Sequence, residues 1–307
     1  MTRNEPTPGF AGPIGFIGPI GFIGLGVMGG PMCANVVRKH LAPVHVFDRN
    51  AAALDEAVQA GARGASSIAE VAAAADLVFL SLPGGSQVDA VCSELAAHWQ
   101  AGATVVDLST TSVAESRAIA AKLAEKGIHF ADAPVARTRE AAQAGTLSIM
   151  VGASEALFAR IAPLLGLVGS DITHCGDVGC GQVVKLVNNT LLFEQVAAIA
   201  EMMVVAERAG VTRERLIEAV GLGSGDSFAL QNHARKAMAP RLFPEKSFPP
   251  EYVIKDLSYA IELARSMGVD PKLAVLAGKY YQAAVEQGYG GRYFPAVIEM
   301  IDRDLVP

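Results

Sequence analysis

Residues 20–29 read Ile-Gly-Phe-Ile-Gly-Leu-Gly-Val-Met-Gly, a short apolar run that leads into a Gly-x-Gly-x-x-Gly string. A helix-like stretch follows at residues 31–40, so the string stands where a strand turns into a helix. In that position Gly24 permits the tight turn and Gly26 lets the backbone approach a pyrophosphate. Gly29 allows close packing at a helix N-terminus, whose dipole favours anions. The stretch predicts a dinucleotide-binding strand–loop–helix unit, and a purely structural glycine-rich turn is the minor alternative.

An acidic residue follows at the distance typical of a ribose ligand. Asp48 closes the next apolar run, 19 residues after Gly29. A carboxylate there favours NAD because it repels a 2′-phosphate, whereas the neighbouring Arg49 leaves NADP open. The cofactor contacts expected from this part of the chain are Gly24, Leu25, Gly26, Val27, Met28, Gly29, Asp48 and Arg49.

Short apolar runs alternate with longer Ala-rich stretches as far as about residue 178. The expected strands are 18–23, 44–47, 77–82, 104–107 and 147–151, and the expected helices are 31–40, 51–60, 86–97 and 112–126. This alternation indicates right-handed βαβ crossovers and a doubly wound parallel sheet of the Rossmann type. The hexapeptide at residues 18–23 repeats residues 12–17, and only the second copy runs into the glycine string, so we assign the strand to it.

The second half of the chain has helical patterning only. Residues 182–209 contain neither Pro nor Gly and predict one long, mostly buried helix. Further helices are expected at 212–220, 255–267, 273–287 and 295–305. We therefore expect a flexible N-terminal extension (1–18), a Rossmann domain (19–178) and an all-α substrate and dimerisation domain (179–307) joined by the long helix. A crevice between two such domains is where a ligand is expected.

Composition narrows the classes of function. The chain has 307 residues, of which 51% are hydrophobic and 18% charged, with a net charge of −6, so we expect a globular protein rather than a nucleic-acid binder. No secretory leader precedes the four scattered cysteines, which favours reduced thiols in the cytoplasm. We expect no membrane helix, and neither the cysteines nor the six histidines have the spacing of a metal site.

Three loops follow predicted strands at the edge of the sheet where ligands bind. Leu82 and Pro83 lie in the first loop and Ser109 and Thr110 in the second, and all four are candidate cofactor contacts. The third loop carries Arg137, which is suited to a bidentate contact with an anionic substrate; a solvated surface arginine is the alternative.

A lysine and two amides lie at the start of the long helix. Helical spacing places Lys185 and Asn189 on one face, one turn apart, with Asn188 about 100° round the helix. A lysine in so apolar a segment is either functional or has only its aliphatic stem buried. Spacing alone leaves these two alternatives open.

Taken together, these motifs resemble the β-hydroxyacid dehydrogenase family, which includes 3-hydroxyisobutyrate dehydrogenase and tartronate semialdehyde reductase. The resemblance runs from residue 19 to the C-terminus in the family's order. It rests on the glycine string, Asp132-Ala133-Pro134-Val135, Gly145-Thr146-Leu147, Gly179-x-Gly181 with Lys185 and Asn189, and Lys255-Asp256-Leu257. It implies that Lys185 is the general acid and base, that Asn189 orients the substrate, that Lys255 lies near the cofactor and that Asp256 orients or caps locally.

One loop departs from the family pattern. Many members carry Ser-Gly-Gly after Asp-Ala-Pro-Val, where this chain has Ala136, Arg137 and Thr138. Together with Asn188 and Asn189, these residues resemble the sulfolactaldehyde reductase branch, which implies a sulfonate substrate.

The leading hypothesis is an NAD(P)-dependent dehydrogenase that acts between the primary alcohol and the aldehyde of a small acid, as 3-hydroxyisobutyrate dehydrogenase does. A sulfolactaldehyde reductase is the first alternative, and an imine reductase is disfavoured because Lys185 is present. A non-catalytic dinucleotide sensor is the alternative from another class, since fold alone does not prove chemistry. The apolar long helix leads us to expect a homodimer or homotetramer.

Overall fold

The computed structural model describes residues 18–245 and 247–306. They form two compact units: the first ends at Lys185 and the second begins at Leu186, inside the helix α8 (Cys180–Arg208). Residues 12–17, the first copy of the repeated hexapeptide, lie outside the described residues, so the flexible N-terminal extension stays a prediction. The second copy forms strand β1 (Ile20–Ile23), as predicted.

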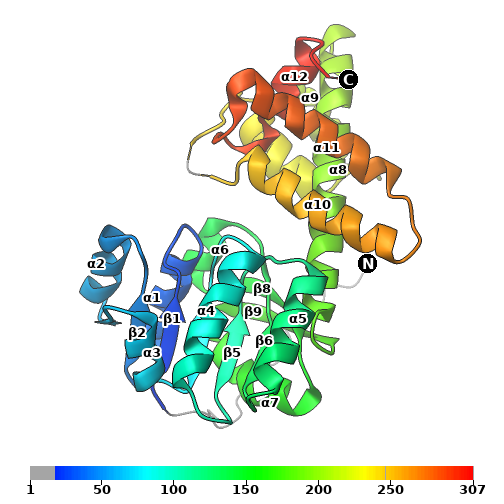
Figure 1. The fold of residues 1–307 in the computed structure, drawn as a ribbon. Coiled ribbons are helices and arrows are strands. Elements are labelled where there is room, and N and C mark those ends of the chain that lie inside the picture. Colours follow the sequence, from blue (N-terminus) through cyan, green and yellow to red (C-terminus); the bar gives the residue numbers. More distant parts are fainter. Residues whose placement is uncertain (1–17, 246, 307) are drawn as a thin grey trace. The chain divides into compact units, whose positions relative to one another are not determined.

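The first unit is built on a nine-stranded sheet with helices on both faces (Figure 1). Its strands are β1, β2 (Val44–Phe47), β3 (Arg63–Gly64), β4 (Leu77–Leu80), β5 (Thr104–Asp107), β6 (His129–Asp132), β7 (Val135–Ala136), β8 (Leu147–Gly152) and β9 (Gly169–Gly176). Its helices are α1 (Gly29–Lys39), α2 (Ala51–Gln59), α3 (Ile68–Ala74), α4 (Gly85–His98), α5 (Val113–Ala124), α6 (Arg139–Ala144) and α7 (Glu155–Leu165).

The sheet has the strand order of a doubly wound dinucleotide-binding fold. Its order is β3-β2-β1-β4-β5-β6-β8-β7, with β9 paired to β8. Pairing is parallel from β3 through β6 and between β8 and β9, while β8 is antiparallel to both β6 and β7. The chain adds β2 and β3 on one side of β1 and then crosses to add β4, β5 and β6 on the other side. The order of the strands therefore reverses between β1 and β4, and ligands bind at such switch points. The predicted Rossmann fold is thus confirmed, with an antiparallel extension.

Alternate side chains of the strands fill two separate cores. On β1, Phe22 belongs to the core covered by α1, α6 and α7, whereas Ile23 belongs to the core covered by α3, α4 and α5. Both side chains are at most 2% exposed, which explains why the central strands are continuous apolar runs. Short polar residues begin several of the helices: Ser67 caps α3, and Ser112 forms a capping box with Glu115 at α5.

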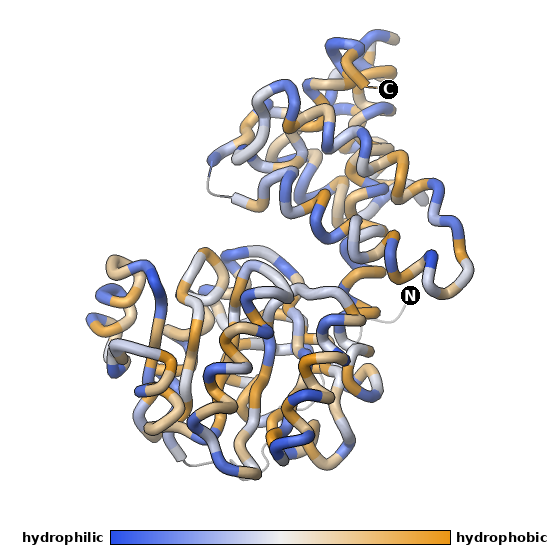
Figure 2. The backbone as a smooth tube through the Cα atoms, in the orientation of Figure 1, coloured by the Kyte–Doolittle hydropathy of each residue, from blue (hydrophilic) through white to orange (hydrophobic). Residues whose placement is uncertain are grey.

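The second unit is helical, as predicted. It comprises the part of α8 from Leu186 onward, α9 (Arg213–Gly221), the π-helix η1 (Ala229–Met238), α10 (Pro250–Ser266), α11 (Lys272–Ala284), the π-helical turn η2 (Val285–Tyr289), the 3₁₀ helix η3 (Phe294–Val297) and α12 (Ile298–Asp302). Phe193 lies at the centre of its core, with the rings of Phe248, Tyr281 and Phe294 within 6.1 Å. Hydrophobic and hydrophilic residues are interspersed along these helices (Figure 2), and the buried apolar residues of α8, α10 and α11 belong to this core.

The long helix α8 has the length and composition of a membrane-crossing segment. Its buried residues, among them Phe193, Val196 and Met203, are part of the core of the second unit. We therefore interpret α8 as a core helix of a globular domain.

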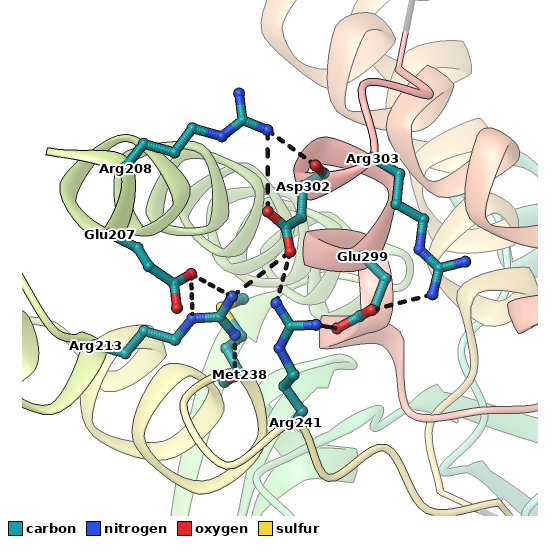
Figure 3. Close-up of polar contacts among 8 residues, drawn as sticks. All are labelled: Glu207, Arg208, Arg213, Met238, Arg241, Glu299, Asp302 and Arg303. Carbon is teal, nitrogen blue, oxygen red and sulfur yellow. Dashed lines mark hydrogen bonds and ion pairs between the residues drawn. The ribbon is translucent and has the colours of Figure 1, made fainter. Parts of the chain in front are cut away.

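A network of arginines and acids ties the C-terminal helix α12 to α8 and η1 (Figure 3). The guanidinium of Arg213, which is 4% exposed, contacts Glu207 at 2.6 Å and donates to the carbonyl of Met238 at 3.0 Å. Arg241 contacts Asp302 on α12 at 2.6 Å. Each of the four arginines in this network lies within 3.9 Å of an acid, so we interpret it as a structural network that links these helices.

Candidate active site

The glycine string forms a loop at the switch point, between β1 and α1. Gly24 has φ +94°, and a Cβ added to it would lie 2.2 Å from the carbonyl oxygen of Ser81. A Cβ on Gly29 would lie 2.0 Å from the carbonyl oxygen of Gly24. A Cβ on Gly26, by contrast, would meet no atom within 4 Å. Gly24 and Gly29 are thus required by the fold itself, whereas Gly26 borders open space where a ligand can approach the backbone.

The start of α1 suits an anion. No side chain caps it, and its first turn carries no acidic residue. Its backbone N–H groups and helix dipole therefore face no competing negative charge from the helix itself. The residues present fit the pyrophosphate of a dinucleotide at the loop that contains Leu25, Val27 and Met28.

Asp48 is fixed to this same loop. Its carboxylate accepts hydrogen bonds from the backbone N–H of Leu25 at 2.6 Å and of Asn50 at 2.7 Å. The acid predicted to bind the ribose therefore lies beside the glycine loop. Arg49 is exposed next to it.

The loops after β4 and β5 are joined to each other. The backbone N–H of Leu82 donates to the Ser109 hydroxyl at 2.8 Å, and the N–H of Ser109 donates to Asp107 at 3.0 Å. Pro83 is exposed, whereas Thr110 is half-buried. The structure thus brings together the two loops that the sequence predicts as cofactor contacts.

The start of α8 is held by a buried acid with no role assigned from the sequence. Asp132, at the end of β6, accepts hydrogen bonds from the N–H of Gly179 at 2.6 Å and of Gln182 at 2.8 Å. Burial raises the pKa of this carboxyl to about 6, although the backbone hydrogen bonds act in the opposite direction. A Cβ on Gly181 would lie 2.8 Å from the Asp132 carboxylate, so Gly181 permits this close approach, whereas Gly179 has φ +91°.

Lys185 and Asn189 lie one turn apart on α8 and are 8% and 5% exposed. The Asn189 amide donates to Asp256 of α10 at 2.7 Å and accepts from Asn188 at 3.1 Å. Asp256 therefore fixes the orientation of the Asn189 amide, in agreement with the orienting role that the resemblance implies. The only signal for this pair in the sequence is the Lys-Asp-Leu motif, because 67 residues separate the two side chains.

Lys255 lies half-buried beside Asp256. Its ammonium is 3.3 Å from the Asp256 carboxylate and lies over the rings of Tyr252 and Tyr259, at 5.9 and 5.5 Å from their centroids. Its charge is therefore balanced within α10.

The loop that departs from the family pattern has an unusual backbone. Arg137 has φ +87°, and its guanidinium forms an ion pair with Asp171 at 2.8 Å and donates to the Thr146 carbonyl at 2.6 Å. Ala136 is buried, and half-buried Thr138 occupies the cap position of α6 without a side-chain hydrogen bond. In this structure Arg137 therefore has an acidic partner of its own.

Known proteins match this chain along nearly its whole length. The family model described as the NAD binding domain of 6-phosphogluconate dehydrogenase matches residues 19–176. The model described as NAD-binding of NADP-dependent 3-hydroxyisobutyrate dehydrogenase matches residues 179–301. The chain is 37% identical to 2-(hydroxymethyl)glutarate dehydrogenase of Eubacterium barkeri over 90% of this chain and 92% of the relative. The chain belongs to the β-hydroxyacid dehydrogenase family.

Two further relatives of this β-hydroxyacid dehydrogenase agree. The 3-hydroxyisobutyrate dehydrogenase of Pseudomonas aeruginosa is 34% identical over 83% of this chain and 88% of the relative. A solved structure of Mycobacterium tuberculosis 3-hydroxyisobutyrate dehydrogenase with L-serine is 30% identical, covers 93% of this chain and 99% of its own, and superposes with a TM-score of 0.84. The predicted family, fold and nicotinamide cofactor are confirmed.

The chain is thus an oxidoreductase that acts on a hydroxyl group of a small acid. The comparisons give no greater support to the sulfonate or sensor alternatives. The individual site residues remain predictions that the geometry supports to different degrees.

Proposed function

We propose that this enzyme interconverts the primary alcohol and the aldehyde of a small 3-hydroxy carboxylic acid, with Lys185 as the general acid and base. The observation that carries the proposal is the placement of Lys185. It is buried on the second turn of a helix whose start is fixed to Asp132 of the dinucleotide-binding sheet. Burial of an ammonium is costly unless it is paired or hydrogen-bonded, and a lysine amine held at this place is suited to proton transfer with a reacting oxygen.

In oxidation, the neutral amine of Lys185 takes the hydroxyl proton of the alcohol. A nicotinamide bound in the first unit would supply the hydride acceptor, and the carbon that carries the hydroxyl would become the aldehyde carbon. In reduction, the Lys185 ammonium returns the proton to the carbonyl oxygen. Asn189, held by Asp256, orients the substrate from one turn away, so most of the rate enhancement comes from positioning.

Most of the proposed cofactor contacts belong to the first unit. We assign the glycine loop, Asp48, Leu82 and Ser109 of the first unit to the dinucleotide. Asp48 supports NAD over NADP because its carboxylate lies beside the glycine loop. Lys255 is assigned to the cofactor on the family resemblance alone.

A carboxylate substrate is favoured over a sulfonate. A sulfonate clamp needs an arginine that is available to the substrate, and Arg137 is already paired with Asp171 at 2.8 Å. Because both partners are about half exposed and such a pair is weak, the Arg137→Ala variant below tests whether a sulfonate displaces Asp171.

The test is the absorbance of reduced nicotinamide during incubation with NAD or NADP and a panel of alcohols. The panel contains 3-hydroxyisobutyrate, 2-(hydroxymethyl)glutarate, L-serine and dihydroxypropanesulfonate. The proposal predicts turnover of a carboxylate with NAD and a loss of about 10²- to 10⁴-fold in kcat for Lys185→Met. The exposed Lys279→Met is the control. Turnover confined to the sulfonate, abolished by Arg137→Ala, would replace this proposal with the sulfolactaldehyde reductase alternative.

We also propose that the enzyme works as a homodimer or homotetramer in the cytoplasm. Large apolar side chains of α8 remain exposed in the single chain: Val187, Leu191, Met202 and Val205 are 51–57% exposed. Their spacing places them along one side of the helix, a surface suited to a second copy. Light scattering of the wild type and of Met202→Glu tests this, since the variant should shift the protein toward smaller assemblies.

A further inference from the structure

Gln182 is a buried polar residue of the first unit to which the reaction above gives no role. It lies on the first turn of α8, three residues before Lys185, and has no exposed surface. Both ends of its amide are used: Nε2 donates to the carbonyl oxygen of Ser109 at 2.8 Å, and Oε1 accepts from the N–H of Thr111 at 3.2 Å. The two backbone groups are more than 70 residues away in the sequence, so this glutamine links the first turn of α8 to the loop after β5.

The hydrogen bonds continue beyond Ser109. Its hydroxyl accepts from the N–H of Leu82, and its own N–H donates to Asp107. A single chain of hydrogen bonds therefore joins the loop after β4, the loop after β5 and the first turn of α8. These are the segments that carry the proposed cofactor contacts and the proposed general base.

We infer that Gln182 is a positioning residue that sets the distance between the Lys185 amine and the cofactor loop Ser109–Thr111. The inference deepens the proposed function and rests on it. One helical turn separates residues 182 and 185, and a turn of α-helix is nearly rigid, so a clamp at Gln182 limits how far Lys185 can move. Hydride and proton transfer are sensitive to such movement because a misplacement of about 1 Å can lower a rate about 100-fold.

The start of the helix itself does not depend on this clamp. The Asp132 carboxylate accepts hydrogen bonds from the backbone N–H groups of Gly179 and Gln182. These bonds do not depend on the side chain of residue 182. A substitution at Gln182 therefore leaves α8 anchored to the sheet and releases only the loop after β5. The role of the side chain is thus separable from the integrity of the fold.

Two variants remove different parts of the clamp. Gln182→Met has a similar length and leaves the Ser109 carbonyl and the Thr111 N–H without this partner. Gln182→Glu keeps an acceptor for the Thr111 N–H but turns a second acceptor toward the Ser109 carbonyl, which repels it. The matched control is Gln282→Met, because Gln282 is exposed on α11 and its amide bonds only to Glu286 on the adjoining turn.

The experiment measures kcat, KM and the primary deuterium isotope effect on kcat with the best alcohol of the panel, and measures NAD affinity by calorimetry. We expect kcat to fall about 10- to 100-fold for both Gln182 variants. The isotope effect should rise because hydride transfer becomes more fully rate-limiting, and kcat should fall by a larger factor than NAD affinity. Gln282→Met should match the wild type in all four quantities.

Two results overturn the inference alone. One is a Gln182→Met enzyme whose kcat and isotope effect equal those of an active wild type. The other is a fall in kcat matched by an equal loss of NAD affinity or by unfolding at the assay temperature, which would make Gln182 a merely structural residue. A wild-type chain that turns over no hydroxy acid overturns the proposed function and, with it, this inference.

Discussion

The buried carboxylate of Asp132 gives the first unit a measurable dependence on pH. Burial raises its pKa from 3.8 to about 6. Between these values the folded protein holds a proton that the unfolded chain has lost, so the free energy of unfolding falls as the pH rises through this window. For the pKa values given, the wild type loses about 1 kcal/mol between about pH 5 and about pH 7 from this group.

The variant Asp132→Asn isolates this effect because asparagine does not titrate in the range. It retains one acceptor oxygen and replaces the other with a donor that faces a backbone N–H, so it should be less stable by about 1–3 kcal/mol. The deficit should be larger at about pH 5 than at about pH 7, by about 1 kcal/mol, because only the wild type is destabilised as the pH rises.

Trp99 provides the assay. It is the single tryptophan of the chain, is 8% exposed in the first unit, and donates to the carbonyls of Ala72 and Ala75. Its fluorescence during urea unfolding therefore reports on the unit that contains Asp132. The exposed Asp55→Asn serves as the control and should show no such change with pH. A deficit of Asp132→Asn that stays constant, or grows as the pH rises, would refute the reasoning.

Three further predictions concern the glycine loop, the ionic network around Arg213 and the hydrogen bond between Asn189 and Asp256. Gly26→Ala should change the free energy of unfolding by less than about 0.5 kcal/mol yet lower NAD affinity at least about tenfold. Gly29→Ala should instead destabilise the fold, because its Cβ would overlap a backbone oxygen. Urea unfolding measures the stability of each variant, and calorimetry measures its NAD affinity. Arg213→Met should cost about 1–3 kcal/mol, because it leaves the buried Met238 carbonyl without its donor and removes the pair with half-exposed Glu207. The exposed Arg208→Met should cost less than about 1 kcal/mol, as measured by denaturation. Asp256→Asn should raise KM for the alcohol more than KM for NAD, since it releases the substrate-orienting amide, and equal effects on both would contradict that role.

Local patterns in the sequence were sufficient for the central part of the fold. The strand at residues 20–23 and the glycine loop after it follow from apolar burial and backbone freedom, both of which are local properties. The same holds for the strands Val44–Phe47 and Thr104–Asp107 and for α8, which begins two residues before and ends one residue before its predicted bounds. The π-helix η1 was not predicted, although its buried residues recur at helical spacing.

The site was less predictable where a role depends on distant partners. Asp132 begins the Asp-Ala-Pro-Val motif and Gln182 directly follows the Gly179-x-Gly181 motif, but their partners are between 47 and 73 residues away. Nothing in the local sequence distinguishes such a buried clamp from an exposed polar residue. The same holds for Arg137, because its partner Asp171 becomes its neighbour only through the pairing of β7 with β8 and of β8 with β9.

The most direct test of the central claim is chemical rescue of Lys185→Ala by small primary amines, with the best alcohol of the panel and saturating NAD. If Lys185 is the general base, the variant should bind NAD normally and lose about 10²- to 10⁴-fold in kcat. Added amines should then restore turnover in proportion to their neutral fraction. A Lys185→Ala enzyme that turns over at the wild-type rate would contradict the account, as would one whose loss no amine restores while substrate affinity falls in proportion.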